Sequence, residues 1–295
     1  MREGGERLPD TLELAVEAAK KEALARIRER YEGKDALDYH NTRHTEKVVR
    51  RASAILAAIY TADRSILDER RLRLGALAAA WHDVIQDCQI NETADGAFTR
   101  RTRKCFTGAN EVASAEEAIR YMREEGGGTF RPEDEEIIRQ VILATVPAAD
   151  FKEGTMVQAN LTPKSDVLAR AVALADLGCA GMDGSEEFVR EGNAVFREDA
   201  IDIRDALRSS ESISREQKDF FVKRMLAWSR VQEKFAAGRK ALFEAELEGL
   251  PEEARRAVRA LFSRFDESIA GAGAKTAERE AMTFEELVSD FGYLR

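Results

Sequence analysis

The chain has 295 residues and a mass of 33.0 kDa, and its 46 Lys and Arg against 55 Asp and Glu give a formal net charge of −9. A chain this acidic, with a pI near 5.2, is poorly suited to nucleic acid or to anionic membranes, so we expect neither as a partner. Hydrophobic residues make up 44% and charged residues 34% of the sequence, a mixture typical of a folded protein with a real core.

The sequence carries no pattern typical of export or membrane insertion. Its longest apolar run, around residues 76–81, is far short of the ~20 residues that cross a bilayer, and residues 1–10 lack the apolar core of a secretory signal. The three cysteines, Cys88, Cys105 and Cys179, are odd in number, far apart and without a CxxC pair. We therefore expect reduced thiols in a cytoplasmic protein, with no disulfide framework.

Helical periodicity dominates the sequence and predicts an all-α fold, a helical bundle. The chain has only five prolines, and the alternation typical of strands is hard to find. Asn41 is expected to cap the helix that follows it, and Pro132 and Pro251 stand where a first helical turn accepts proline. In chain order, helices are predicted over residues 12–30, 44–60, 74–85, 112–122, 137–142, 165–177, 215–247, 252–268 and 284–291.

The remaining segments suggest how the chain is organised. Residues 87–107 are polar and arginine-rich and are predicted to form a loop, and residues 271–274 a flexible joint. We expect an N-terminal helix over 1–29, a catalytic helical domain over 30–190, and C-terminal helices over 191–295 that complete the bundle or form an appended lobe. Phenylalanines at helical spacing are predicted to form core or a subunit interface, which leaves a homo-oligomer open: Phe220, Phe221, Phe235, Phe243, Phe262 and Phe265.

The chain has three histidines, and they fall in two short motifs. In the motif over residues 39–44, a cap at Asn41 would place His44 in the first turn of a helix and His40 just before it. Both rings can then reach one cavity. The second motif is the pair His82-Asp83 at the end of an apolar helix, where an imidazole and a carboxylate can meet one cation.

A third candidate is Asp176, a carboxylate in an otherwise apolar helix. A charge there is costly unless it is paired or bound to metal, although Asp183 lies close enough in sequence to compete for the role. Together, His44, His82, Asp83 and Asp176 would offer mixed nitrogen and oxygen ligands to a divalent metal. Such ligands suit Mn, Fe, Zn, Co or Ni better than Ca, and Mg also stays open.

A metal held by few protein ligands keeps positions open for water. It can lower the pKa of that water from 15.7 toward ~7, which supplies a hydroxide nucleophile at neutral pH. His40 could then protonate the leaving alkoxide.

This pattern of a histidine, a His-Asp pair and a distant aspartate resembles the HD-domain superfamily of metal-dependent phosphohydrolases over about residues 30–185. The sequence of residues 39–44 (Tyr-His-Asn-Thr-Arg-His) is similar to the corresponding motif in the branch that contains the cyclic-nucleotide phosphodiesterases and related bacterial HD proteins. Residues 142–145 (Ile-Leu-Ala-Thr) and 175–177 (Ala-Asp-Leu) also look like segments of that branch. The resemblance implies an HD-domain, phosphodiesterase-like helical bundle.

The resemblance also implies a role for each candidate residue. His40 is expected to be the general acid, and Asp83 a catalytic residue that binds the metal and bridges to a second ion. The metal ligands are expected to be His44, His82, Asp83 and Asp176. Asn110 and Glu111 match a segment of bacterial relatives and are expected to orient bound water from behind the ligands, with an ordinary helix start as the alternative.

The chain also differs from family members that hold two metals firmly. No histidine lies between Asp83 and Asp176, so we expect one firmly held ion, with a second held only through Asp83, waters and substrate. Arg100, Arg101 and Arg103 are candidates to bind a substrate phosphate, although a solvated charged loop is the other interpretation.

We therefore expect hydrolysis of a phosphate ester in a nucleotide or another small phosphorylated metabolite. The alternative is a 3′,5′-cyclic-nucleotide phosphodiesterase. Two features differ from those enzymes: Val146 stands where they carry an aspartate, and the sequence does not show which glutamine would bind the purine base. A further alternative is a non-catalytic HD-fold scaffold, which would usually have lost its ligands.

Overall fold

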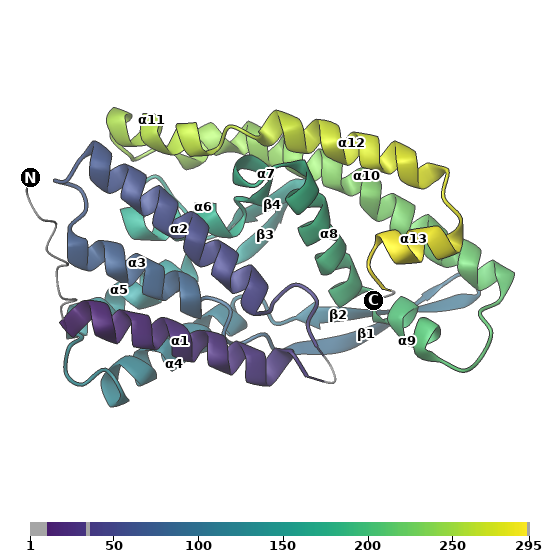
Figure 1. Ribbon diagram of the computed structural model, residues 1–295, viewed down its shortest axis with the longest axis horizontal. Coiled ribbons are helices and arrows are strands. Elements are labelled where there is room, and N and C mark those ends of the chain that lie inside the picture. Colours follow the sequence, from purple (N-terminus) through teal and green to yellow (C-terminus); the bar gives the residue numbers. More distant parts are fainter. Residues whose placement is uncertain (1–10, 34–35, 294–295) are drawn as a thin grey trace, which may run out of the picture.

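The computed structural model describes residues 11–33 and 36–293, and this part of the chain is mostly helical (Figure 1). Of the predicted N-terminal helix, residues 1–10 lie outside the described residues. The helices are α1 (Thr11–Tyr31), α2 (Thr42–Ala62), α3 (Glu69–Trp81), α4 (Ala109–Glu124), α5 (Pro132–Leu143), α6 (Val167–Asp176), α7 (Cys179–Met182), α8 (Ser185–Asp199), α9 (Ile201–Arg208), α10 (Arg215–Glu246), α11 (Glu252–Leu261), α12 (Phe265–Glu280) and α13 (Phe284–Asp290). The strands are β1 (Cys88–Asp95), β2 (Phe98–Cys105), β3 (Pro147–Asp150) and β4 (Thr155–Gln158).

Two antiparallel hairpins correct the all-α expectation. The segment 87–107, predicted as a loop, forms β1 and β2, with Asp95 opposite Phe98 across a two-residue turn. Gly96 takes a positive φ of 64° in that turn, which glycine adopts without strain. Most side chains on the two strands are polar, so no apolar alternation marked them in the sequence. The second hairpin, β3–β4, has only four residues in each strand.

The predicted joint at 271–274 is also incorrect, because these residues lie inside helix α12. Glycine suits this part of the helix because the neighbouring helix packs too closely to leave room for a side chain. A Cβ added at Gly271 would lie 2.3 Å from the Cβ of Ser185 at the start of α8. Helix α12 runs alongside the long helix α10 across one side of the molecule (Figure 1).

The main core is built from α1 to α6, with contributions from α7, α8, α10, α11 and α12. Trp81 is fully buried at its centre and donates its indole N–H to the carbonyl of Ala19 in α1, at 3.0 Å. A second apolar cluster joins the end of α8, helix α9, the first half of α10 and α13. The packing of α8 and α10 beside the main core brings residues far apart in sequence to one cavity.

Cys88 and Cys105 form a disulfide, which corrects the expectation that all three thiols are reduced. The two residues face each other at the open end of the β1–β2 hairpin, with their Cα atoms 3.9 Å apart. The sequence did not predict this hairpin, so it gave no indication that Cys88 and Cys105 lie close together. Cys179 is free and buried. Among the described residues, every helix is too short or too polar to cross a membrane.

Candidate metal centre

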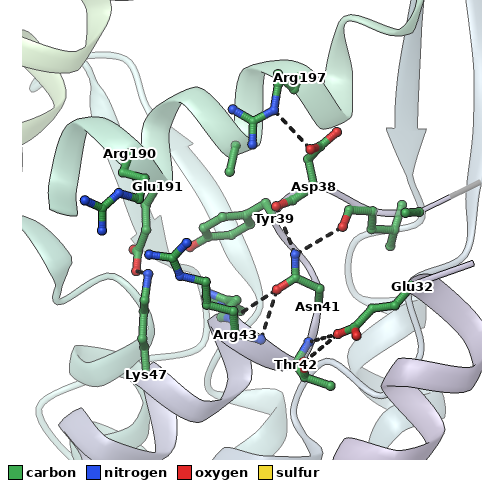
Figure 2. A pocket seen from close by; sticks show the side chains of 14 residues that line it. Glu32, Asp38, Tyr39, Asn41, Thr42, Arg43, Lys47, Arg190, Glu191 and Arg197 are labelled. Atoms are coloured by element: carbon green, nitrogen blue, oxygen red, sulfur yellow. Dashed lines mark hydrogen bonds and ion pairs between the residues drawn. The ribbon is translucent and has the colours of Figure 1, made fainter. Parts of the chain in front are cut away.

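The loop before α2 is fixed by the predicted cap (Figure 2). The Oδ1 atom of Asn41 accepts hydrogen bonds from the backbone N–H groups of Arg43, at 3.0 Å, and His44, at 3.3 Å. Its Nδ2 atom donates to the carbonyls of Leu37 and Asp38. An asparagine at this position satisfies N–H groups that a helix start leaves unpaired. The cap therefore sets the orientation of the first turn, which carries His44.

Three helix ends supply the predicted ligands. His44 lies in the first turn of α2, His82 and Asp83 follow the last residue of α3, and Asp176 is the last residue of α6. The carboxyl ends of α3 and α6 carry partial negative charge, which favours a cation nearby. The sequence thus brings four side chains to the point where these helix ends meet.

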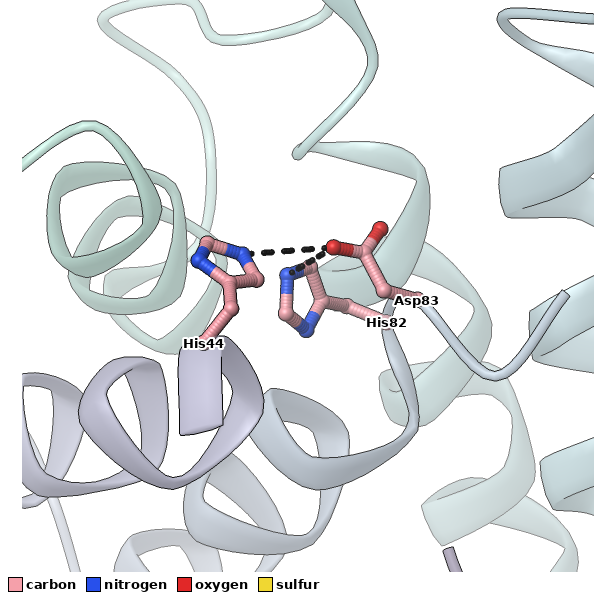
Figure 3. A group of neighbouring side chains, drawn as sticks. All are labelled: His44, His82 and Asp83. Atoms are coloured by element: carbon pink, nitrogen blue, oxygen red, sulfur yellow. Dashed lines mark ion pairs between the residues drawn. The ribbon is translucent and has the colours of Figure 1, made fainter. Parts of the chain in front are cut away.

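The ligand atoms lie close together (Figure 3). The Oδ2 atom of Asp83 lies 3.0 Å from Nε2 of His82 and 3.3 Å from Nε2 of His44. The Oδ1 atom of Asp176 lies 3.4 Å from Nε2 of His44 and 3.6 Å from Nε2 of His82. Bonds of about 2.1 Å to a shared ion would place neighbouring ligand atoms about 3.0–3.4 Å apart. Nε2 of His44, Nε2 of His82 and Oδ2 of Asp83 therefore lie close enough together to hold one metal ion, and Oδ1 of Asp176 lies at the edge of this spacing.

Unpaired nitrogen atoms support the same assignment. His44 is 3% and His82 1% exposed, yet the Nε2 atoms of both rings lack a hydrogen-bond partner. The Nδ1 atom of His82 lies 2.9 Å from the carbonyl of Ala79, which can only accept, so Nδ1 carries a proton. This contact fixes the ring and leaves Nε2 of the neutral imidazole to bind metal. Buried polar atoms are normally satisfied, and a cation at this point would satisfy both Nε2 atoms, while Nδ1 of His44 is also without a partner.

The carboxylates are held in their charged form. Burial alone would raise the pKa of Asp83 and of Asp176, but the nearby imidazoles of His82 and His44 hold both pKa values below the usual range. Burial lowers the pKa of His82, and Asp83 and Asp176 together outweigh it and raise that pKa. Gln86 donates to the Oδ1 atom of Asp83 at 2.8 Å, which leaves Oδ2 directed at the two rings. The cluster therefore holds two charged carboxylates that stabilise positive charge between them.

His40 lies beside this cluster, with its ring centroid 5.9 Å from that of His44. Its Nδ1 atom lies 2.5 Å from Oε1 of Glu198 in α8, and Oε2 of Glu198 accepts from the backbone N–H groups of Tyr39 and His40. Burial lowers the pKa of His40, but the charge and hydrogen bond of Glu198 outweigh it and raise the pKa to about 9. Glu198 is 5% exposed and no motif in the sequence singled it out.

Replacement of Glu198 by glutamine is expected to lower the pKa of His40 below about 9, because the neutral amide removes the charge that favours the imidazolium. The chain has three histidines, so NMR of selectively labelled, metal-free protein can follow each ring through a pH titration. Because the folded pKa is raised above 6.5, the pair stabilises the fold fully below that pH and less as the pH rises through about 9. An unchanged His40 titration in Glu198→Gln would contradict this assignment.

The cluster opens into a cavity of about 470 Å³. The cavity is lined on one side by His40, Asp83 and Asp176, and on the other by Gln232 and aromatic residues of α8 and α10. Gln232 is 4% exposed and neither amide atom has a partner. The aromatic residues are Phe188, Trp228 and Phe235, the last of which was expected to serve only as core or interface. Sequence spacing did not reveal Gln232, because α10 joins the site only through tertiary packing.

Asn110 and Glu111 lie at the start of α4 and line the same cavity. Asn110 accepts from the backbone N–H of Asp87 at 3.2 Å and donates to its carbonyl at 3.1 Å. Glu111 accepts from the backbone N–H of Gly108 at 2.5 Å, and burial followed by the charge of Asp83 raises its pKa. The structure therefore brings both residues to the site while they also begin the helix.

The structure does not bring the arginine candidates into this lining. Arg100 and Arg101 lie on β2, where Arg100 pairs with Asp95 at 2.6 Å and Arg101 with Asp205 of α9 at 2.5 Å. Arg103 lies on the same strand, and neither it nor the other two line the cavity. Only Cys105 and Thr107, at the end of this segment, reach it.

Asp183, the competitor of Asp176, belongs to a different cluster. Arg51 is fully buried and donates to Oδ2 of Asp183, at 2.6 and 2.8 Å, and to Oε1 of Glu191 at 2.7 Å. Cys179, Asp183 and Glu191 also lie close enough together to bind a cation. The guanidinium of Arg51 already supplies positive charge there, and of the two aspartates only Asp176 approaches the imidazoles.

Arg51→Ala is expected to destabilise the fold by about 3–5 kcal/mol, because it removes the one buried guanidinium that Asp183 and Glu191 share. Asp183 then keeps only Arg50, which is exposed, and Glu191 keeps only Lys47. Urea unfolding in the presence of a chelator measures this effect separately from metal binding. Arg123→Ala removes an exposed pair with Glu135 and is the matched control, expected to leave the unfolding midpoint unchanged. Equal midpoints for the Arg51 variant and the wild type would refute the assignment.

Comparison of the chain with protein-family models, with curated proteins and with solved structures gave no match. The structure itself shows a mostly helical protein with a buried group, His44, His82 and Asp83, that could hold a metal ion.

Proposed function

We propose that this protein is a metal-dependent phosphohydrolase with an HD-type helical bundle, acting on a phosphate ester of a nucleotide or another small phosphorylated metabolite. The observation that carries the proposal is the convergence of His44, His82, Asp83 and Asp176, with both buried Nε2 atoms unpaired. The two carboxylates, Asp83 and Asp176, line a cavity. A cavity of about 470 Å³ is within the ordinary range for small-molecule sites.

The four residues would hold one divalent cation, and Asp83 could share a second with substrate and water. When bound, such a cation supplies Lewis-acid charge for a phosphoryl oxygen and lowers the pKa of water. Asn110 and Glu111 border the same space and would position that water. The proposed HD-type bundle, the metal and these roles rest on the site geometry together with the sequence resemblance.

His40 would donate the proton to the leaving oxygen. With its pKa raised to about 9, the ring is protonated at neutral pH, and Nδ1 is directed at Glu198. The Nε2–H group is then the proton that remains for the substrate. General acids of this kind typically contribute 10²–10⁴-fold to a rate.

One observation favours the 3′,5′-cyclic-nucleotide alternative. The amide of Gln232 offers a donor and an acceptor, which matches the edge of a nucleobase, and it lies in the wall formed by Phe188, Trp228 and Phe235. Gly192 packs directly against this amide, since an added Cβ would lie 2.7 Å from it. An aromatic heterocycle stacked on this wall would satisfy both unpaired atoms of Gln232.

The proposal is tested by metal analysis and a substrate panel. Protein purified without chelator is expected to contain about one transition metal per chain, because ligand sets of this kind bind tightly. Hydrolysis is then assayed with added Mn, Mg, Co and Ni on phosphate monoesters and on 3′,5′-cyclic nucleotides. Preference for the cyclic compounds selects the alternative, and metal-free wild-type protein without activity would favour a scaffold.

A further inference from the structure

We infer that the substrate carries its charge on a single phosphate group and that nucleoside diphosphates and triphosphates are excluded. This inference rests on the proposed function and narrows the substrate class of the same cavity. It follows from the distribution of charged side chains around the metal cluster.

Among the described residues, no lysine or arginine lines the catalytic cavity. Its charged residues are His40 and four carboxylates, namely Asp83, Glu111, Asp176 and Glu191. A metal would offset Asp83 and Asp176, and Arg51 and Lys47 already pair with Glu191. Glu111 is then the carboxylate without a cationic partner in this lining. Proteins that bind polyphosphates surround them with Arg, Lys or backbone N–H groups, and here the wall opposite the metal is Gln232 with aromatic and aliphatic side chains.

A group of cations surrounds a neighbouring cavity, which His44 also lines. Tyr39 and Glu191 line both the catalytic cavity and a second cavity of about 340 Å³ (Figure 2). The four cations that line the second cavity are Arg43, Lys47, Arg190 and Arg197.

These four cations already have partners. Lys47 lies 3.1 Å from Oε1 of Glu191, and Arg197 lies 3.0 Å from Oδ1 of Asp38. Arg43 and Arg190 each contact a carboxylate at the start of α8: Glu187 for Arg43, and Glu186 and Glu187 for Arg190. A polyphosphate in the catalytic cavity would have to break these pairs and displace Tyr39 to reach them. Its second and third phosphates would instead face Glu111 and an apolar wall.

The test uses one nucleoside as its 3′,5′-cyclic monophosphate, monophosphate, diphosphate and triphosphate. The free metal concentration is held fixed, because polyphosphates chelate metals. We expect kcat/KM for the better single-phosphate compound to exceed that for the diphosphate and triphosphate by about 100-fold or more. Calorimetric titration of metal-loaded His40→Gln protein with the same compounds gives an independent binding readout, in which only the single-phosphate compounds bind measurably.

A pair of variants tests the physical cause. Val231 lines the cavity on α10 and is 45% exposed, whereas Val112 on α4 is 48% exposed and does not line it. Val231→Lys is expected to raise the diphosphate-to-monophosphate ratio of kcat/KM by about 10-fold, because it adds the absent cation, and Val112→Lys is expected to leave it unchanged.

The outcomes separate the inference from the function on which it rests. Metal-loaded protein that hydrolyses none of the compounds, nor any other phosphate ester, overturns the proposed function. Comparable hydrolysis and binding of the monophosphate and the triphosphate overturns the inference and leaves the function standing. Tight binding of the triphosphate that depends on Arg43 and Arg190 would show that the second cavity receives the additional phosphates, which also overturns it.

Discussion

His82→Ala is expected to abolish bound metal and phosphate-ester hydrolysis together. The Nε2 atom of His82 lies 3.0 Å from Oδ2 of Asp83 and 3.6 Å from Oδ1 of Asp176, and its other nitrogen is fixed by the carbonyl of Ala79. Removal of the ring leaves one imidazole beside two carboxylates that still repel each other. Elemental analysis of protein purified without chelator, followed by assays with added metal, measures both losses.

Two aspartate variants provide a matched comparison for this result. Asp176→Asn is expected to lose the metal, whereas Asp183→Asn is expected to keep it, because Asp183 pairs with Arg50 and Arg51 and does not approach the imidazoles. Circular dichroism establishes that each variant is folded. Retention of metal by Asp176→Asn and its loss from Asp183→Asn would reverse the assignment of the ligand.

The sequence could reveal the candidate metal ligands because the segments that carry them follow local rules. Histidine is rare in this chain, Asn41 forms the expected cap, and a carboxylate at the end of an apolar helix has few other roles. The helices that carry these residues are marked by strong apolar periodicity, so their ends could be placed. The convergence itself was expected only from the resemblance of the sequence to a family pattern, because spacing alone does not bring α6 to α2.

The other half of the site depends on contacts that no local pattern records. Glu198 reaches His40 from α8, and Gln232 reaches the same cavity from α10. Both are ordinary polar residues on amphipathic helices, and only tertiary packing makes them buried. The disulfide was missed for a related reason, since the β1–β2 hairpin that pairs Cys88 with Cys105 lacks the apolar alternation by which half-buried strands are found.

His40→Gln is expected to lower kcat by about 10²–10⁴-fold while the bound metal is retained. The ring of His40 lies beside the ligand cluster, 5.9 Å from that of His44 between centroids, and its Nδ1 is engaged by Glu198, so its loss removes a proton donor and leaves the cation site intact. Glutamine keeps a polar group near Glu198 but has no proton to transfer at neutral pH. Metal content and steady-state kinetics of the same preparation measure the two effects.

The leaving group distinguishes proton donation from a merely structural role. An alkoxide leaving group needs a proton as the ester bond breaks, whereas 4-nitrophenolate is stable enough to leave without one. The loss of kcat in His40→Gln is therefore expected to be large for an alkyl phosphate ester and small for a 4-nitrophenyl ester. An equal loss for both esters would mean that His40 only positions the loop that Glu198 holds, and the general acid would then have to be another group in the cavity.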